Sequence, residues 1–262
     1  MARKLLFLAS PTVDYIGGDG PRPGGPGLYG GLAARILGYE PHVVGPLGFE
    51  DLWVIGEYRR YGIEYLGPRR PGCGYRFRHF YTERGRVSEI LCMPHPLALD
   101  EALEALMTKT YEVIVVSPVG CEVPPWILPA LASTGIPVTL DIQGFTRCYG
   151  DLWEQVLTRL HGALLVHVSS DDLPQPPRLG GSVVAYTKGL EGGLVVAGEG
   201  WISELPRPSR LVEDPTGAGD VYTVVAAIRL ARHSDPVRAA VEAGDTAPDV
   251  LAKVKELIGQ QR

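Results

Sequence analysis

The segment with the clearest chemical potential is the run 213–220, Glu-Asp-Pro-Thr-Gly-Ala-Gly-Asp, followed at once by the apolar run 221–228. A glycine turn that leads into a helix can aim several backbone N–H groups at one point, and the helix N-terminus adds partial positive charge there. Such a point attracts an anion such as a phosphate. A carboxylate beside it, here Asp220, can take a proton from an attacking hydroxyl. These parts predict phosphoryl transfer to an alcohol; the alternative is a glycine turn in which Asp220 only caps a buried helix.

The same run closely resembles the C-terminal signature of the ribokinase family, the phosphofructokinase-B-type sugar kinases, usually written Asp-Thr-x-Gly-Ala-Gly-Asp. The resemblance implies that Asp220 is the catalytic base and that the amides of Gly217, Ala218 and Gly219 form the anion hole. Pro215 takes a place where threonine is common in the family, and this change leaves the predicted chemistry of the turn intact.

A second glycine-rich stretch, 24–31, resembles the family's N-terminal motif, in which Gly-Gly is followed by Asn-x-Ala and a short helix. The resemblance places Gly24 and Gly25 at the substrate. Tyr29 occupies the position of the family asparagine that helps to hold the substrate, so the sugar contacts there must differ. Asp14 falls where the family has a carboxylate that accepts hydrogen bonds from substrate hydroxyls, a task that suits two carboxylate oxygens. Taken without the family, Asp14 is an ordinary loop acid.

The glycines of 25–30 also match Gly-x-Gly-x-x-Gly, the dinucleotide-binding fingerprint, and Glu50 and Asp51 follow about 20 residues on. The fingerprint needs its glycines directly at the end of the first strand, whereas here a long Pro/Gly-rich loop intervenes. A nicotinamide- or flavin-dependent oxidoreductase is therefore the weaker interpretation. No Gly-x4-Gly-Lys-Ser/Thr run occurs in the sequence, which excludes a Walker-type phosphate loop.

The stretch 187–193 resembles the family's Thr-x-Gly-x-x-Gly nucleotide strand and turn, whose glycines let the backbone approach ATP closely. The resemblance implies that Thr187, Gly189 and Gly192 bind the nucleotide, together with Thr216 of the C-terminal signature. Without the family, the same stretch reads as a hairpin turn.

Two more motifs are assigned to the phosphates by the resemblance. Ser169 and Asp172 stand where the family carries Asn-x-x-Glu, a motif that helps to organise Mg2+. Because aspartate is shorter than glutamate, we expect Asp172 to reach the metal indirectly, through water. The run 141–147 resembles Asp-x-Asn-x-x-Arg and places Arg147 beside the phosphate path, at the end of a predicted strand, where α/β sheets hold ligands. The alternative for 169–172 is a polar loop with a helix cap.

The segment 69–93 departs from the pattern of the rest of the chain. Aromatic residues recur at every second position from Tyr75 to Tyr81, and a charged turn at 83–86 precedes a second apolar run. This pattern predicts an antiparallel hairpin inserted into the α/β body. Six arginines lie in the segment, so we expect a lid whose aromatic face covers a small molecule and whose arginines, Arg76 and Arg78 among them, face anionic groups. The alternative is a solvated hairpin. The family resemblance also implies a homodimer through the lid, which the exposed aromatic stripe expected here would fit.

Strand-like apolar runs alternate with helical patterns along the remaining chain, which predicts βαβ units and a mostly parallel sheet. With 262 residues and no long linker, we expect a single α/β domain, 1–262, in which 69–93 is the inserted lid. The resemblance implies a ribokinase-like three-layer sandwich. The expected strands are 5–9, 43–44, 113–117, 137–141, 163–168, 183–187 and 194–197, and the expected helices are 28–37, 52–61, 100–107, 126–133, 152–160, one after residue 220 and one from about 247 to 258.

Composition limits the partners and the compartment. The net charge of −5 argues against nucleic acid, and no run approaches the apolar length, about 18 residues, of a membrane span. The opening apolar run is too short for a signal peptide and reads as a first strand. The four cysteines form no Cys-x-x-Cys pair, so we expect no zinc site, reduced thiols and a cytoplasmic location. The absence of asparagine, with 23 prolines, is typical of thermophilic proteins.

The sequence therefore predicts an ATP- and Mg2+-dependent kinase acting on a small sugar or polyol. The Asp-Pro-Thr-Gly-Ala-Gly-Asp string and the Ser-Ser-x-Asp loop resemble the inositol-kinase-like branch, which favours a cyclic polyol such as myo-inositol. Pentoses, hexoses, nucleosides and phosphorylated sugars remain open. The alternative of another class is a ligand-binding or regulatory protein that has lost catalysis, suggested by the changes at Tyr29, Ser169 and Asp172.

Overall fold

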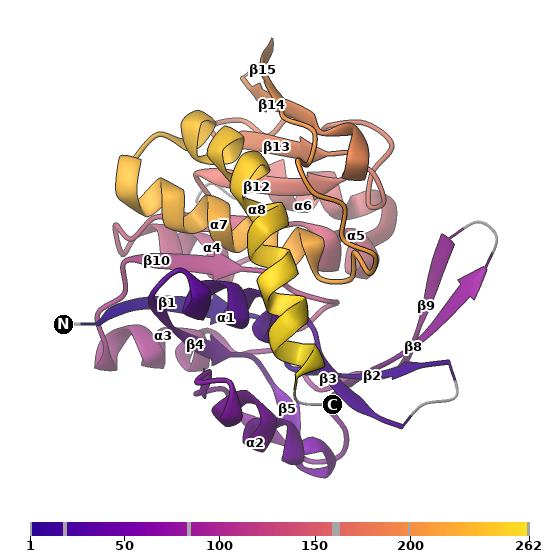
Figure 1. Cartoon of the computed structure of the whole chain (residues 1–262). Coiled ribbons are helices and arrows are strands. Elements are labelled where there is room, and N and C mark those ends of the chain that lie inside the picture. Colours follow the sequence, from indigo (N-terminus) through magenta and orange to yellow (C-terminus); the bar gives the residue numbers. More distant parts are fainter. Residues whose placement is uncertain (1, 18–19, 83–84, 159–162, 199, 261–262) are drawn as a thin grey trace.

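A nine-stranded sheet forms the centre of the computed structural model, which describes residues 2–17, 20–82, 85–158, 163–198 and 200–260 (Figure 1). Its order is β15-β14-β13-β12-β11-β10-β1-β4-β6; the seven strands from β13 to β6 run parallel, and β14 and β15 form an antiparallel edge. The central strands are apolar almost throughout, as expected where helices cover both faces. The strands are β1 (Arg3–Leu8), β4 (Tyr39–Val44), β6 (Glu64–Tyr65), β10 (Val113–Val116), β11 (Val138–Asp141), β12 (Leu165–Ser169), β13 (Val183–Thr187), β14 (Gly193–Ala197) and β15 (Gly200–Leu205).

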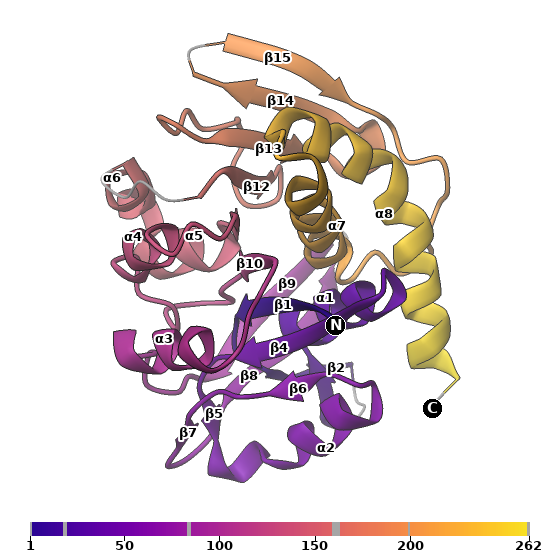
Figure 2. The same cartoon turned by 90° about the vertical axis from the view of Figure 1, so that its left-hand side faces the viewer.

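Helices cover the two faces of this sheet, which gives the three-layer α/β architecture that the sequence predicts (Figure 2). One core cluster joins a face of the sheet to α1, α2, α7 and α8, and a second joins the opposite face to α3, α4 and α5. The helices are α1 (Pro26–Ile36), α2 (Trp53–Arg60), α3 (Leu99–Thr108), α4 (Ile127–Ala132), α5 (Gln143–Tyr149), α6 (Trp153–Thr158), α7 (Ala218–His233) and α8 (Pro236–Gly259), with short 3-10 turns η1 (Phe49–Asp51), η2 (Gly150–Leu152) and η3 (Gly189–Glu191).

The final helix, α8, begins far earlier than the expected residue 247. Pro236 occupies its first turn, and the Asp235 side chain caps it by accepting hydrogen bonds from the amides of Val237 and Arg238. The alanines near its start are buried against α7, so the helix forms by packing despite Pro248 in its interior. The correction follows from a cap and a small-residue face that lack the large apolar side chains by which helices are usually recognised.

A second sheet, the lid sheet, has the order β3-β2-β8-β9 and projects from one side of the body (Figure 1). The antiparallel hairpin of β8 (Tyr75–Thr82) and β9 (Gly85–Cys92) lies within the segment 69–93. Two strands of this sheet were not expected, because residues 11–24 read as a Pro/Gly-rich loop. They are β2 (Thr12–Ile16), which pairs parallel with β8, and β3 (Arg22–Gly24). A further two-stranded pair, β5 (Leu47–Gly48) and β7 (Arg69–Arg70), lies beside the lid base.

Other departures from the sequence prediction are smaller. The helix α5 and the edge strand β15 were not expected. The predicted helix 152–160 is present as η2 and α6 up to Thr158, and its last two residues lie outside the described part of the chain. Within the described residues, no helix is both long and apolar enough to cross a membrane.

The four cysteines form two disulfides, which corrects the expectation of reduced thiols. Cys73, in the loop before β8, pairs with Cys92 at the end of β9, and Cys121 pairs with Cys148 in α5. The pairs are separated by 19 and 27 residues in sequence and meet because the hairpin and the sheet bring their elements together. Spacing along the sequence therefore concealed them.

We expect these disulfides to be measurable and stabilising. In the absence of reductant, thiol titration of the denatured protein should detect no reactive cysteine. The double variant Cys73→Ser/Cys92→Ser should lose about 3 kcal/mol of stability, because a crosslink across a loop of this size restricts the unfolded chain. Thermal melting with the Cys121–Cys148 pair intact provides the measurement, and four reactive thiols in the unreduced protein would contradict the pairing.

Candidate active site

The signature run forms a tight turn at the N-terminus of α7. Gly217 adopts a left-handed conformation, with φ of 81°, and the helix begins at Ala218. The Ala218 amide donates to the Pro215 carbonyl at 2.9 Å, and the Thr216 amide donates to the Asp214 carboxylate at 3.0 Å. Gly219 and Asp220 thus lie in the first helical turn, where backbone N–H groups point out of the helix end. Helix ends of this kind can bind anions, and the phosphate site that the sequence predicts here stays a prediction; we call residues 215–220 the anion-binding turn.

Tyr29, on α1, packs against this turn. A side chain at position 217 would overlap the Tyr29 ring, so glycine is required there by contact as well as by its backbone angle. Lys255 of α8 lies over the same ring, 4.9 Å from its centroid, and donates to Asp214 at 2.8 Å. Tyr29 therefore supports the turn from behind, and the substrate contact predicted for it stays a prediction.

Asp14, on β2, is buried at the junction of the lid sheet and the body. Its carboxylate accepts a hydrogen bond from the Thr12 hydroxyl at 2.8 Å and lies 3.7 Å from Nε2 of His79 on β8. Gly24 of β3 lies against the carboxylate so closely that a side chain there would overlap it, and Gly25 next to it has φ of 79°. The structure thus brings Asp14, Gly24 and Gly25 together, as the sequence predicts.

Tyr58, which the sequence analysis did not single out, connects the two acids. Its hydroxyl is buried and donates to the Gly24 carbonyl at 3.4 Å. Burial raises the pKa of Tyr58 well above its ordinary value, and the negative charges of Asp14 and Asp220 add to this effect. The connection in space runs through the start of α1: Gly24, just before the helix, lies against the Asp14 carboxylate, and Tyr29, in its first turns, packs against Gly217.

Asp220 is also linked to the end of β11. The Gln143 side chain, at the start of α5, donates to Asp220 at 3.3 Å, and the Gln143 amide donates to Asp141 at 3.0 Å. Gln143 occupies the asparagine position of the Asp-x-Asn-x-x-Arg run, which is the signal that could have identified it. Arg147, on the same helix, donates to the Val119 carbonyl at 3.2 Å and thereby holds the loop after β10.

A buried polar cluster lies directly beneath the anion-binding turn. His167 of β12 contacts Asp141 through Nδ1 at 3.1 Å and Thr187 through Nε2 at 3.0 Å. The Thr223 hydroxyl lies 3.0 Å from His167 Nδ1 and donates to the Gly219 carbonyl at 2.9 Å. Burial opposes ionisation of Asp141, yet its hydrogen bond with His167 and the positive charge there hold the Asp141 pKa below its ordinary value. The carboxylate is therefore ionised within the cluster.

The predicted donor residues border this cluster. Thr187 ends β13, and the turn that follows contains η3, with Gly189 at φ 55° and Gly192 at φ 84°. Asp172 lies after β12, where burial and the like charge of Asp141 raise its pKa to about 6. Mg2+ prefers oxygen ligands, and a bound cation would stabilise a buried carboxylate whose charge is disfavoured in this way. Asp172 therefore fits the metal role that the resemblance implies for it. Among the described residues, no group of three acidic, histidine or cysteine side chains could hold a metal unaided.

The lid arginines make ion pairs. Arg76 contacts the buried carboxylate of Asp51 at 2.9 Å and Glu50 at 2.9 Å, so its guanidinium fastens β8 to η1. Arg78 lies 3.6 Å from Glu89 across the hairpin, and both side chains are about half exposed. The contact of these arginines with a substrate anion therefore stays a prediction. The alternating aromatic face of β8 is confirmed, because the rings of Tyr75, Phe77 and His79 stack in sequence at 6.0 Å. All three side chains are buried, and Tyr75 and Phe77 pack with Val119, which corrects the expectation of an exposed stripe.

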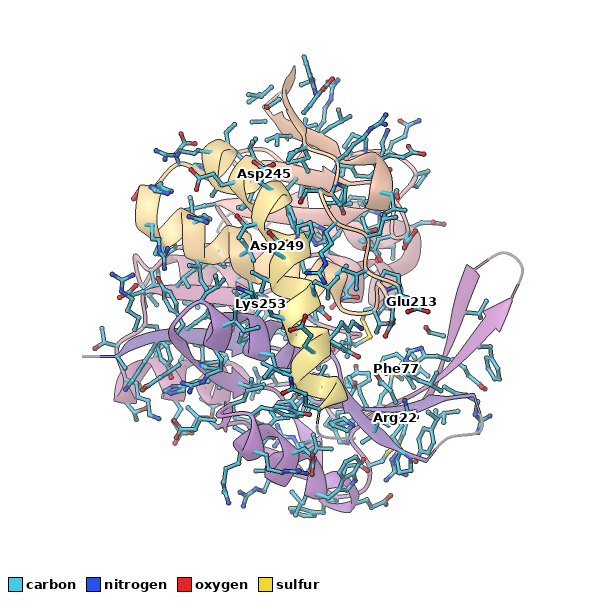
Figure 3. All side chains as sticks on the ribbon, viewed as in Figure 1. Arg22, Phe77, Glu213, Asp245, Asp249 and Lys253 are labelled. Atoms are coloured by element: carbon cyan, nitrogen blue, oxygen red, sulfur yellow. A yellow bond between two sulfur atoms is a disulfide. The ribbon has the colours of Figure 1, made fainter. Side chains whose placement is uncertain are left out.

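Figure 3 shows the loop before α7 and the lid sheet in one view: Glu213 lies in the loop that leads into α7, and Phe77 and Arg22 lie on the lid sheet below it. A cavity of about 370 Å³ lies elsewhere, at the opposite ends of the strands, lined by residues that include Ile136, Leu164 and Ser182. It contains none of the predicted site residues.

Comparisons with known proteins identify the fold. A pyrophosphate-dependent kinase in the ribokinase family, complexed with a pyrophosphate analog and myo-inositol, matches with a TM-score of 0.71 at 18% identity, over 94% of each chain. An uncharacterized sugar kinase from Pyrococcus horikoshii matches at 0.74 and 14% identity, over 94% of this chain and 90% of that one. Aminoimidazole riboside kinase from Salmonella enterica matches at 0.69 and 17%, over 96% and 99%.

The chain therefore has the ribokinase-like fold that the sequence resemblance implies. No protein-family model matches the sequence, and no curated protein is significantly similar to it. At these identities the likeness establishes the fold, while the chemistry is argued from the residues of the site.

The raised pKa of Asp172 predicts a pH dependence of stability. The folded protein holds this proton up to about pH 6, whereas the unfolded chain releases it near pH 4, so the stability from the protonated acid is full below pH 4 and is lost as the pH rises through 6. Asp172→Asn should therefore match wild type near pH 4 and exceed it by about 2 kcal/mol at pH 8. Urea denaturation across this range measures the difference; the exposed Asp171→Asn is the control, and an equal gain at both pH values would contradict the assignment.

Proposed function

We propose that this protein is a kinase that transfers a phosphoryl group to a hydroxyl of a small sugar or cyclic polyol. The observation that carries the proposal is that the start of α1 contacts two features at once: Gly24 lies against the Asp14 carboxylate, and Tyr29 packs on Gly217 of the turn that contains Asp220. The negative charges of Asp14 and Asp220 both raise the pKa of Tyr58, in addition to the effect of burial, which supports a common site for the two acids. A base beside a phosphate site and a carboxylate suited to hydroxyls is the arrangement that phosphorylation of an alcohol needs.

Each residue has a distinct role in this proposal. The Asp220 carboxylate accepts the proton of the acceptor hydroxyl as its oxygen bonds to phosphorus, and the bond from phosphorus to the leaving phosphate oxygen breaks. The amides of Gly217, Ala218 and Gly219 stabilise negative charge on the transferring group. Gln143 orients Asp220 by donating to one of its oxygens.

The donor side is assigned to Thr187, Gly189, Gly192 and Thr216, with Arg147 near the phosphate path. Mg2+, when bound, would supply positive charge that neutralises the phosphate oxygens, and Asp172 would hold it through water; the raised pKa of this acid supports the assignment. The electrostatic influence of Asp141, Arg147 and His167 on Asp172 supports one shared phosphate region at the ends of β11, β12 and β13.

The donor is ATP or inorganic pyrophosphate. ATP follows from the likeness of 187–193 to the family's nucleotide turn, whereas the descriptions of three of the similar structures name a pyrophosphate-dependent kinase. Both molecules present a phosphoanhydride to the same anion site, so the proposed chemistry at Asp220 is unchanged by the choice.

The acceptor is a compact molecule with adjacent hydroxyls, and myo-inositol is the preferred candidate. Asp14 and its neighbour His79 supply acceptor and donor groups from the lid side, and one similar structure is described in complex with myo-inositol. Nucleosides and phosphorylated sugars are the alternatives. We also infer that the lid forms a homodimer contact, which its exposed apolar residues Phe80, Val87, Ile90 and Leu91 support.

Loss of the base should abolish turnover. With Mg-ATP and Mg-pyrophosphate as donors and a panel of polyols, sugars and nucleosides, Asp220→Asn should lower kcat by about 10³-fold, because it removes the proton acceptor. The control is Glu213→Gln, an exposed acid of the same loop, which should retain activity. Turnover that survives in Asp220→Asn would exclude this residue as the base, and wild type that binds sugar without turnover with either donor would favour a binding protein.

Asp14 should determine acceptor affinity. Asp14→Ala should raise the KM for the acceptor between about tenfold and 100-fold, the loss expected for hydrogen bonds to a charged group, while the donor KM changes little. Steady-state kinetics with each substrate varied in turn separates the two. Glu89→Gln, an exposed acid of the lid, is the control, and an unchanged acceptor KM in Asp14→Ala would remove Asp14 from the acceptor site.

A further inference from the structure

The cluster centred on His167 joins two parts of the chain that are distant in sequence. One side is the end of β13, where Thr187 lies, and the other is the first turn of α7, where Thr223 returns to the Gly219 carbonyl. His167 contacts both threonines, at 3.0 Å in each case, and Asp141 at 3.1 Å. The mechanism proposed above uses none of these contacts.

The surroundings fix the orientation of the imidazole. The His167 and Asp141 side chains are each only 3% exposed, and the His167 ring packs on the Tyr222 ring with centroids 4.9 Å apart. Asp141 is itself held by the backbone N–H of Gln143 at 3.0 Å, and the Thr223 oxygen lies 3.3 Å from its carboxylate. Both ring nitrogens thus have protein partners, and rotation of the ring would leave buried polar groups without them.

We propose that His167 is a positioning residue for the phosphoryl donor, which fixes the Thr187 hydroxyl and locks the end of β13 to the anion-binding turn. The inference rests on the proposed function. The ligand that the aligned groups would hold is the phosphoanhydride of ATP or pyrophosphate.

The chemistry of a hydroxyl explains the effect on Thr187. A threonine hydroxyl has one hydrogen and two lone pairs, and its hydrogen rotates to suit its partners. The contact with His167 Nε2 uses one of these three positions of the Thr187 hydroxyl and thereby fixes the directions of the other two. Because Nδ1 of the neutral ring donates to the ionised Asp141, Nε2 accepts the Thr187 hydrogen. The lone pairs that remain on Thr187 can accept from a water that donates in turn to a phosphate oxygen, and less conformational freedom is lost on binding.

The packing of the turn explains the effect on the anion hole. A side chain at Gly219 would come within 3.2 Å of His167 Cε1, so the turn lies directly on the imidazole. The ring therefore sets the distance between the amides of the turn and the end of β13. A displacement of about 1 Å between groups that bind one phosphate chain is enough to lower the rate of transfer about 100-fold.

Paired variants separate positioning from stability. His167→Gln can place an amide near the Nε2 position and keep a hydrogen bond to Thr187, whereas His167→Asn reaches Asp141 and loses Thr187. Thr187→Val removes the hydroxyl with little change of shape. We expect the donor KM to rise at least tenfold in His167→Asn and in Thr187→Val and by less in His167→Gln, with the acceptor KM unchanged. Calorimetric titration with Mg-ATP and with Mg-pyrophosphate should show the same order of affinities.

The double variant His167→Asn/Thr187→Val completes the test. If His167 acts through Thr187, the second change adds no further loss of donor affinity, since coupled residues are not additive. Effects that multiply in the double variant, or a lower melting temperature with unchanged donor affinity in His167→Asn, would overturn the inference. Should His167→Asn fail to fold, an unchanged donor affinity in Thr187→Val would overturn it equally.

The same titrations distinguish this inference from the proposed function. Donor binding that follows the expected order, without turnover of any acceptor, would support the role of His167 and contradict the kinase reaction. Turnover with equal donor affinity in all variants would support the kinase and contradict the role of His167. A wild-type protein that binds neither donor would contradict both.

Discussion

The seating of the first turn of α7 on the ends of β11 and β12 is the contact on which the site depends. The helix is buried over most of its length, from Val221 to Leu230, so the core fixes its axis. Its first turn then meets an ionised Asp141 that is removed from water. The hydrogen bonds from His167 and from the backbone N–H of Gln143 compensate the cost of burying this charge. The hydrophobic core sets the direction of the helix, and the polar cluster sets how far its end stands above the sheet.

The elements that the sequence identified best were those with strong local signals. The signature turn was recognisable because its backbone requires glycine, as the left-handed conformation of Gly217 shows. The buried parallel strands were recognisable because they are continuously apolar. The sequence predicts only the second half of α8, because the first half packs through alanines. It does not predict β2, because a strand of five residues between prolines and glycines resembles a loop. Both formed because tertiary packing outweighed weak local preference.

Within the site, residues with family-like spacing were found, and residues whose role depends on distant partners were not. Asp14, Gly24 and Gly25 meet as expected, whereas Tyr58 and His167 gain their importance from contacts with elements far away in the chain. The arginines show how a local count of charge misses distant partners. Charge counted along the sequence suggested anion binding, and the structure adds that Arg76 neutralises Asp51, a buried acid 25 residues earlier. A charge is available to a ligand only after the protein's own buried charges are satisfied.

The lid sheet also determines how the site can close. Because β2 lies between β3 and β8, Asp14 and His79 belong to the same hydrogen-bonded sheet, while Asp220 belongs to the body. The Cys73–Cys92 disulfide joins the two ends of the hairpin, and the ion pair of Arg76 with Asp51 fastens its base. Any swing of this sheet must carry Asp14, the proposed acceptor-binding residue, with it as part of one hydrogen-bonded unit. Closing over the substrate and turning its hydroxyl toward the base would then be one movement with one hinge, rather than two events that have to be coordinated.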